Sequence, residues 1–255
     1  TDFANKFQFP VVETIAGRAN LLDTHDLNIG PLGVTGSNSA NNIAEEADVI
    51  LAIGTRLQDF TTGSWTAFSK DAKIICLNVA RHDAAKHLSL PIVGDAKLGL
   101  NLLSHELDGY KTPSEWIESA RKERVVWNDY VEKNTNLKNG PSSYAQAIGV
   151  INANCDPRDR IVAAAGGLPA EVTANWRTLG VSTVDVEFGF SCMGYEIAGG
   201  WGARIAQSEK ESENDTIVFT GDGSYLLMNS DIYSSVLTQK KMIILVLDNG
   251  GFAVI

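Results

Sequence analysis

Short apolar runs recur along the chain and alternate with segments of helical spacing or with glycine-rich turns. Such runs lie at 48–54 and 73–79 in the first half and at 216–220 and 242–247 in the second. Continuous apolar runs bounded by turn residues are typical of strands buried on both faces of a parallel sheet. Helices between such strands indicate an α/β fold. We therefore predict two doubly wound parallel-sheet domains.

The pattern also predicts where the domains divide. Residues 1–110 form the first domain, which ends in a helix over 96–107 with Leu98, Leu102 and Leu103 facing inward. A connector over 111–142 consists of a helix and a polar linker from Lys133 to Ser142. Residues 143–255 form the second domain.

A glycine-rich stretch over 17–42 follows the first predicted strand. Its glycines, Gly30, Gly33 and Gly36, do not have the Gly-x-Gly-x-x-Gly spacing of a dinucleotide site. No helix clearly begins at the last of them. We interpret the stretch as a structural loop.

Composition limits the classes of protein. The chain has 255 residues and a formal net charge of −10, which argues against a basic surface for nucleic acid. No apolar stretch approaches the ~20 residues that span a bilayer, and the first ten residues do not form a signal peptide. Three widely spaced cysteines favour reduced packing thiols in a cytoplasmic protein. The four histidines lack metal-site spacing. A start at Thr1 without methionine predicts a fragment of a longer polypeptide.

The last thirty-five residues carry the candidate chemistry. Gly221, Asp222, Gly223 and Ser224 follow one predicted strand, an amphipathic helix is predicted over 225–237, and the turn 248–251 follows the next strand. Asp222 and Asn249 therefore end neighbouring strands, where open α/β sheets bind ligands. Carboxylate, amide and carbonyl oxygens suit Mg²⁺ completed by phosphate oxygens. Taken singly, both segments are also common turn sequences.

The pair of turns is more specific than either alone, because 25 residues separate Gly223 from Asn249. This arrangement resembles the cofactor motif of thiamine diphosphate enzymes. Met193, before Gly194-Tyr195, occupies the place where that family has a bulky apolar residue under the cofactor. The segment Ala-Asp-Val-Ile-Leu-Ala-Ile-Gly-Thr-Arg at 47–56 is similar to the family's central domain.

The resemblance implies a site for thiamine diphosphate and Mg²⁺. The backbones of Ser191 and Met193 would hold the aminopyrimidine, and Gly221, Gly223 and Ser224 would contact the diphosphate. Asp222, Asn249 and the carbonyl of Gly251 would bind the metal, with Asn249 and Gly251 also meeting the cofactor. No catalytic residue is expected in this chain. The activating Glu is expected in an amino-terminal domain of a partner subunit, so we expect a homodimer or homotetramer and an inactive fragment.

Within the family, the run from Phe190 to Gly200 and the turn Asp248-Asn249-Gly250-Gly251 are most similar to enzymes that hydrolyse a C–C bond. This likeness implies a small cyclic 1,2-diketone as substrate, opened to 5-deoxy-glucuronic acid in inositol catabolism. The alternative is a decarboxylase or ligase acting on 2-oxo acids, similar to acetohydroxyacid synthase or glyoxylate carboligase. A non-enzyme alternative is a nucleotide-binding α/β module in which both motifs are only turns.

Overall fold

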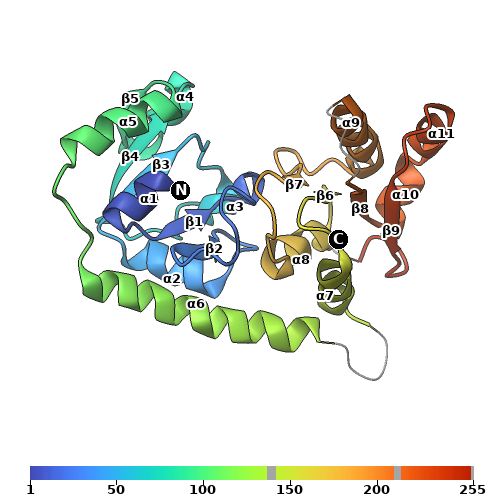
Figure 1. The fold of residues 1–255 in the computed structure, drawn as a ribbon, viewed down its shortest axis with the longest axis horizontal. Helices are drawn as coiled ribbons and strands as arrows, with labels where there is room; N and C mark the ends of the chain where they lie inside the picture. Colours follow the sequence, from blue (N-terminus) through green and yellow to red (C-terminus); the bar gives the residue numbers. More distant parts are fainter. Residues whose placement is uncertain (137–141, 210–213, 254–255) are drawn as a thin grey trace. The chain divides into compact units, whose positions relative to one another are not determined.

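The computed structural model describes residues 1–136, 142–209 and 214–253, which fall into two compact units (Figure 1). Unit 1 comprises 1–17 and 25–129, and unit 2 comprises 18–24 and 130–255. The central part of the predicted linker, 137–141, lies outside the described residues. The predicted boundaries at 110 and 142 stay predictions. In the described ranges, no helix is long and apolar enough to cross a membrane.

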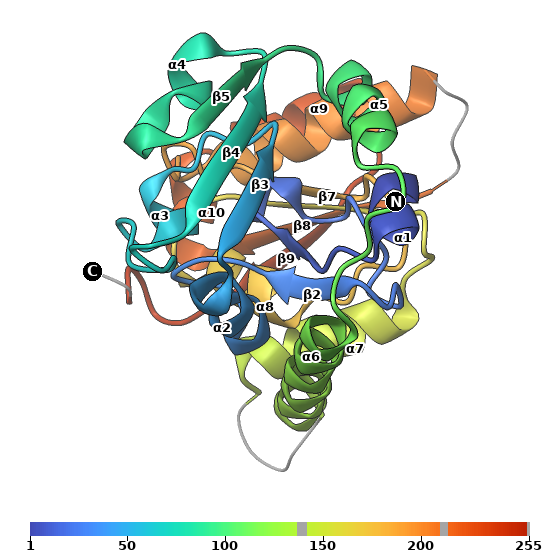
Figure 2. The ribbon, with the colours of Figure 1, turned by 90° about the vertical axis from the view of Figure 1, so that its left-hand side faces the viewer.

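The strands of unit 1 are all parallel, as predicted, but they form two sheets rather than one. Strand β1 (Val11–Glu13) pairs with β2 (Asn28–Pro31). Strands β3 (Val49–Ile53), β4 (Lys73–Asn78) and β5 (Leu90–Val93) lie side by side in that order (Figure 2). The apolar runs thus predicted β3 and β4 to within two residues.

Short helices connect these strands and one long helix follows them. The α-helices are α1 (Asp2–Phe7), α2 (Asn38–Glu46), α3 (Asp59–Thr62), α4 (Arg81–Ala84), α5 (Ala96–Glu106) and α6 (Ser114–Thr135), and the residues of α6 from Tyr130 onward belong to unit 2. Two 3₁₀ turns, η1 (Ile15–Gly17) and η2 (Lys86–Leu88), complete the unit. Ser37 caps α2 by accepting a hydrogen bond from the amide of Ala40 at 3.1 Å.

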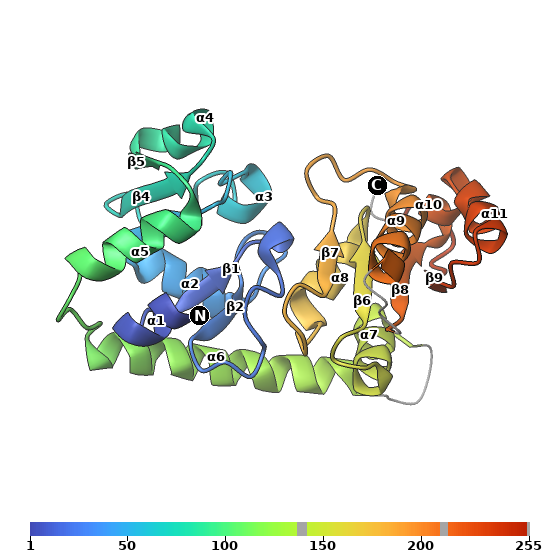
Figure 3. The same ribbon diagram turned by 45° about the horizontal axis from the view of Figure 1, so that its top comes forward.

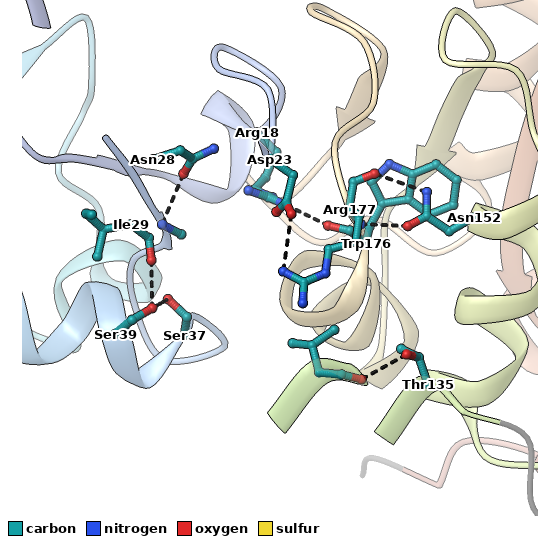
Figure 4. A network of polar contacts seen from close by, with 12 residues as sticks. Arg18, Asp23, Asn28, Ile29, Ser37, Ser39, Thr135, Asn152, Trp176 and Arg177 are labelled. Carbon is teal, nitrogen blue, oxygen red and sulfur yellow. Dashed lines mark hydrogen bonds and ion pairs between the residues drawn. The ribbon is translucent and has the colours of Figure 1, made fainter. Parts of the chain in front are cut away.

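Strand β2 lies inside the stretch 17–42 that we had interpreted as a loop. Its four residues are buried although they lack an alternating apolar pattern. Gly30 has φ +117°, and a Cβ there would lie 2.6 Å from Ser37 Oγ, so glycine is required for packing. Ser37 and Ser39, which follow the strand, are hydrogen-bonded to it. The Oγ of Ser39 donates to the carbonyl of Ile29 at 2.6 Å (Figure 4). The glycines therefore have a structural role.

The predicted inward face of α5 is wrong for two residues. Leu98 and Leu102 are 65% and 68% exposed, and only Leu103 is half-buried. The helix instead approaches β4 through Gly99, where a Cβ would lie 2.6 Å from a methyl group of Leu77. A small residue therefore makes this contact, which the leucine pattern does not reveal.

Unit 2 contains one four-stranded parallel sheet in the order β7-β6-β8-β9. The strands are β6 (Arg160–Ala163), β7 (Val184–Val186), β8 (Thr216–Gly221) and β9 (Ile243–Leu247). Helices α7 (Tyr144–Asn154) and α8 (Gly167–Asn175) cover one face, and α9 (Tyr195–Glu209) with α11 (Ser230–Leu237) covers the other (Figures 1 and 3). This is the doubly wound arrangement predicted from the sequence.

The single helix predicted over 225–237 is two helices. Helix α10 (Asp222–Leu227) begins directly at the end of β8, and α11 begins at Ser230 after a break at Met228 and Asn229. Met228 has φ −146° and ψ 60°, outside the helical region. The apolar residues Leu226, Tyr233 and Val236 are exposed in this chain, so their helical spacing does not mark a buried face.

A short segment from the amino-terminal part of the sequence belongs to unit 2. Arg18 donates to the carbonyl of Trp176 at 2.8 Å, and Asp23 forms an ion pair with Arg177 at 3.2 Å (Figure 4). The carbonyl of Ala19 accepts from the amide of Ser182 at 2.8 Å. These contacts hold 18–24 within unit 2.

The cysteines differ in their surroundings, although all three are free thiols as predicted. Cys76 is buried and Cys155 is half-buried, and burial raises the pKa of both thiols. Cys192 is exposed, so the predicted packing role is wrong for this residue. Through the described ranges, no three His, Cys, Asp or Glu side chains cluster as a metal site.

Candidate functional site

Three segments of unit 2 meet at the carboxyl edge of its sheet. They follow β6, β8 and β9, which are neighbours in the sheet. The chain leaves β6 toward β7 on one side and returns to β8 on the other, so β6 and β8 flank the point where the strand order reverses. Ligands of open α/β sheets bind at this kind of switch point.

Asp222 and Asn249 lie close together at this edge, as the sequence predicted. Asp222 is the first residue of α10, directly after β8, and Asn249 follows β9. The amide nitrogen of Asn249 lies 3.5 Å from Oδ1 of Asp222. Register explains the proximity, because Gly221 at the end of β8 is paired with Leu247 at the end of β9.

Tyr144 holds the side chain of Asn249 through a hydrogen bond. Nδ2 of Asn249 donates to the hydroxyl of Tyr144 at 2.6 Å. The opposite end of the amide, Oδ1, meets no donor in the described part of the chain, which suits a metal ligand. Tyr144 is the first residue of α7, where the Ser143–Gln146 capping box fixes the start of the helix. No local pattern in the sequence indicates Tyr144, because 105 residues separate it from Asn249.

The turn after Asn249 requires glycine and folds back over the β8 loop. Gly250 and Gly251 have φ +83° and +131°, which other residues rarely adopt. Asp248 supports the turn by accepting from the amide of Gly250 at 2.8 Å. A Cβ on Gly223 would lie 2.7 Å from the ring of Phe252, so the absence of a side chain at 223 permits this close approach.

The loop before α9 brings Met193 to the same place. Glu187 shapes the loop by accepting from the amides of Phe190 and Cys192 at 3.1 and 3.0 Å. Ser191 within it has φ +51°, an uncommon backbone conformation that clusters at functional sites. Met193 is 42% exposed and lines the pocket.

Gly194 and Tyr195 complete this loop. Gly194 has φ +92°, and a Cβ there would lie 2.4 Å from Cβ of Met228. Burial, together with the carboxylates of Asp185 and Glu187, raises the pKa of the Tyr195 phenol. The phenol therefore remains neutral at neutral pH.

Ser224 is engaged inside the protein. Its hydroxyl donates to Oε2 of Glu196 at 2.8 Å and accepts from the amide of Gly194 at 2.7 Å. The residue is buried. Any contact of Ser224 with a diphosphate would therefore come from its backbone rather than from the hydroxyl.

The loops enclose one pocket that gathers the predicted site residues, except that Ser191 does not line it. The lining comprises Tyr144, Ala165, Gly166, Gly167, Leu168, Met193, Gly221, Asp222, Gly223, Ser224, Asn249, Gly251, Phe252 and Ala253. The turn at 165–167 leads into α8, and a glycine turn before a helix can approach a phosphate. Gly166 in this turn has φ +84° with no neighbour crowding its Cβ position.

Comparison with known families agrees with this geometry. Residues 1–103 match the thiamine pyrophosphate enzyme central domain, and residues 164–255 match the C-terminal TPP binding domain of the same enzymes. The chain belongs to the thiamine pyrophosphate enzymes. Unit 2 therefore contains a thiamine-pyrophosphate-binding domain, and every residue that lines the pocket except Tyr144 lies in the matched range.

Individual relatives share one name. A 3D-(3,5/4)-trihydroxycyclohexane-1,2-dione hydrolase of Clostridium botulinum (strain Alaska E43 / Type E3) is 34% identical over 278 residues, covering 99% of this chain and 43% of the relative. The protein of that name from Geobacillus thermodenitrificans (strain NG80-2) is 35% identical over 277 residues, covering 99% and 42%. The chain thus spans less than half of the length of these relatives.

The residues present fit the cofactor of the family. The pocket combines one carboxylate, one amide oxygen and the carbonyl-bearing turn at Gly251, which are hard ligands suited to a divalent cation between protein and diphosphate. Positions 221 and 223 carry no side chain, so a phosphate group can approach the backbone there. Met193 supplies an apolar surface in the same pocket.

Proposed function

We propose that the pocket of unit 2 holds thiamine diphosphate through Mg²⁺. Asp222, Asn249 and the carbonyl of Gly251 would bind the metal, and the backbone of 221–224 would meet the diphosphate. Met193 and the backbone of Ser191 would support the aminopyrimidine. The observation that carries this assignment is the convergence of Asp222, Asn249 and Met193 on one pocket from three separate loops.

We further propose that the whole protein hydrolyses a C–C bond of trihydroxycyclohexane-1,2-dione. This substrate comes from the name of the relatives, which are similar over almost the whole of this chain. When bound, thiamine diphosphate supplies a carbon nucleophile for the carbonyl and accepts the electron pair of the broken bond. The residues of this chain would bind and orient the cofactor. The remaining assignments, namely the product 5-deoxy-glucuronic acid, a homo-oligomer and a cytoplasmic location, stay predictions.

Product analysis with the intact protein tests the proposed reaction. Supplied with thiamine diphosphate and Mg²⁺, the protein is expected to convert the cyclic dione to an open-chain deoxy-uronic acid with uptake of one water. Pyruvate and glyoxylate, offered separately, are expected to give at most a hundredth of that rate, because they lack the ring. Carbon dioxide release or carboligation from either 2-oxo acid, with no turnover of the dione, would favour the decarboxylase or ligase function instead.

A further inference from the structure

Glu196 is a buried carboxylate beside the pocket. It is not among the residues proposed to bind the cofactor or the metal. It is the second residue of α9 and only 1% exposed. No lysine or arginine in the described ranges forms an ion pair with it. A carboxylate without water or a counter-ion is costly to bury unless hydrogen-bond donors satisfy it.

The donors that satisfy Glu196 come from three different segments, namely two loops and the first turn of α10. Oε1 accepts from the amide of Ala165 at 3.1 Å, in the turn after β6. Oε2 accepts from the amide of Gly194 at 2.9 Å, beside Met193, and from the hydroxyl of Ser224 at 2.8 Å, in α10 after β8. Hydrogen bonds to a carboxylate are stronger than those between neutral groups, so this one side chain ties the three segments together.

The three segments are also the parts of the site that would contact different portions of the cofactor. Ala165 and Ser224 line the pocket on the diphosphate side, and Gly194 follows the apolar residue that would support the aminopyrimidine. The distances between these three residues are limited by the size of the one carboxylate group that they all contact. A shift of Gly194 relative to Ser224 would change the distance between the two binding regions.

We propose that Glu196 is a positioning residue for thiamine diphosphate, which fixes the loop of Met193 against the diphosphate loops. The inference rests on the proposed cofactor site. Glu196 does not line the pocket and acts through Ala165, Gly194 and Ser224. A ligand that spans both regions depends on this alignment more than a ligand that occupies the diphosphate region alone.

The test compares thiamine diphosphate with inorganic diphosphate, each with Mg²⁺, by calorimetric titration of the intact protein. Glu196→Ala is expected to raise the Kd of thiamine diphosphate at least about tenfold, with a change of less than about threefold for inorganic diphosphate. Glu196→Gln keeps an acceptor for Ala165 and a partner for Ser224 but sets an amide donor against Gly194. It is expected to recover affinity for thiamine diphosphate to within about threefold of the unmodified protein.

Glu171→Ala is the matched control, because Glu171 is a glutamate of the same unit whose side chain, among the described residues, bonds only to Asn175, one turn along α8. It is expected to leave both affinities unchanged. Equal losses of affinity for the two ligands in both Glu196 variants would indicate a general structural role and overturn the proposal. Unchanged binding of thiamine diphosphate by Glu196→Ala would also overturn it. Failure of the unmodified protein to bind thiamine diphosphate would instead overturn the proposed function itself.

Discussion

Replacing Gly194 with alanine is expected to displace the Met193 loop and to weaken thiamine diphosphate binding more than tenfold. Gly194 has φ +92°, and the added methyl group would lie 2.4 Å from Cβ and 2.5 Å from Cγ of Met228. Backbone strain of this kind costs about 1–3 kcal/mol, and the steric overlap adds to it. We therefore expect the free energy of unfolding to fall by at least about 2 kcal/mol. Denaturant unfolding and calorimetry of the intact protein measure both effects.

Gly202→Ala is the control for this substitution. Gly202 lies in α9, eight positions along the chain, and nothing lies within 4 Å of its Cβ position. Alanine at such a helical position is expected to stabilise by up to about 1 kcal/mol, with unchanged cofactor affinity. If the two variants had similar free energies of unfolding and similar cofactor affinities, the packing of Gly194 against Met228 and the role of the Met193 loop in cofactor binding would be contradicted.

Replacing Asp222 with alanine is expected to have the largest effect on metal binding. Asp222 supplies the only carboxylate among the predicted metal ligands, and its Oδ1 lies 3.5 Å from the amide of Asn249. We expect the loss of this ligand to weaken Mg²⁺-dependent binding of thiamine diphosphate about a hundredfold or more, equivalent to about 3 kcal/mol. Asp222→Asn keeps an oxygen ligand without the charge, so its effect is expected to be smaller. Titration of the cofactor at fixed Mg²⁺ measures both.

Asp231→Ala removes the same charge from the first turn of α11, outside the pocket. This control is expected to leave cofactor affinity unchanged. If Asp222→Ala bound thiamine diphosphate as tightly as Asp231→Ala, the turn at 221–224 would be only a turn, and the metal assignment would fail.

The apolar runs predicted the strands that position the site. Strands β3, β4, β8 and β9 lie within two residues of their predicted bounds, because consecutive β-branched and aliphatic residues in a parallel sheet are buried on both faces. The position of Asp222 and Asn249 followed from these strands, since the carboxyl ends of neighbouring parallel strands share one edge. The local pattern was sufficient here because Asp222 and Asn249 closely follow the strands.

The predictions failed where a contact depends on a small or distant residue. Leu98 and Leu102 have helical spacing, yet α5 packs through Gly99 and leaves them exposed. Strand β2 is held by pairing with β1 and by a hydrogen bond from Ser39. Neither contact can be inferred from the residues of β2 itself. Periodicity within one segment does not show which face meets the rest of the protein.

The same limit explains the missed site residues. Glu196 bonds to Ala165 and Ser224, which are 31 and 28 residues away. A glutamate among the apolar and small residues that begin α9 was the available signal, because a charged residue in such surroundings needs buried partners. Tyr144 gave no comparable signal, since its position at the start of a helix has no local link to Asn249.

The most direct measurement is calorimetric titration of thiamine diphosphate into the intact, metal-depleted protein, with and without added Mg²⁺. A site built on Asp222, Asn249 and Gly251 predicts saturable binding of one cofactor per chain that requires the metal. It also predicts that chelation of the metal weakens binding at least about a hundredfold. Equally tight binding in excess chelator, or no binding with Mg²⁺ present, would contradict the assignment of this pocket.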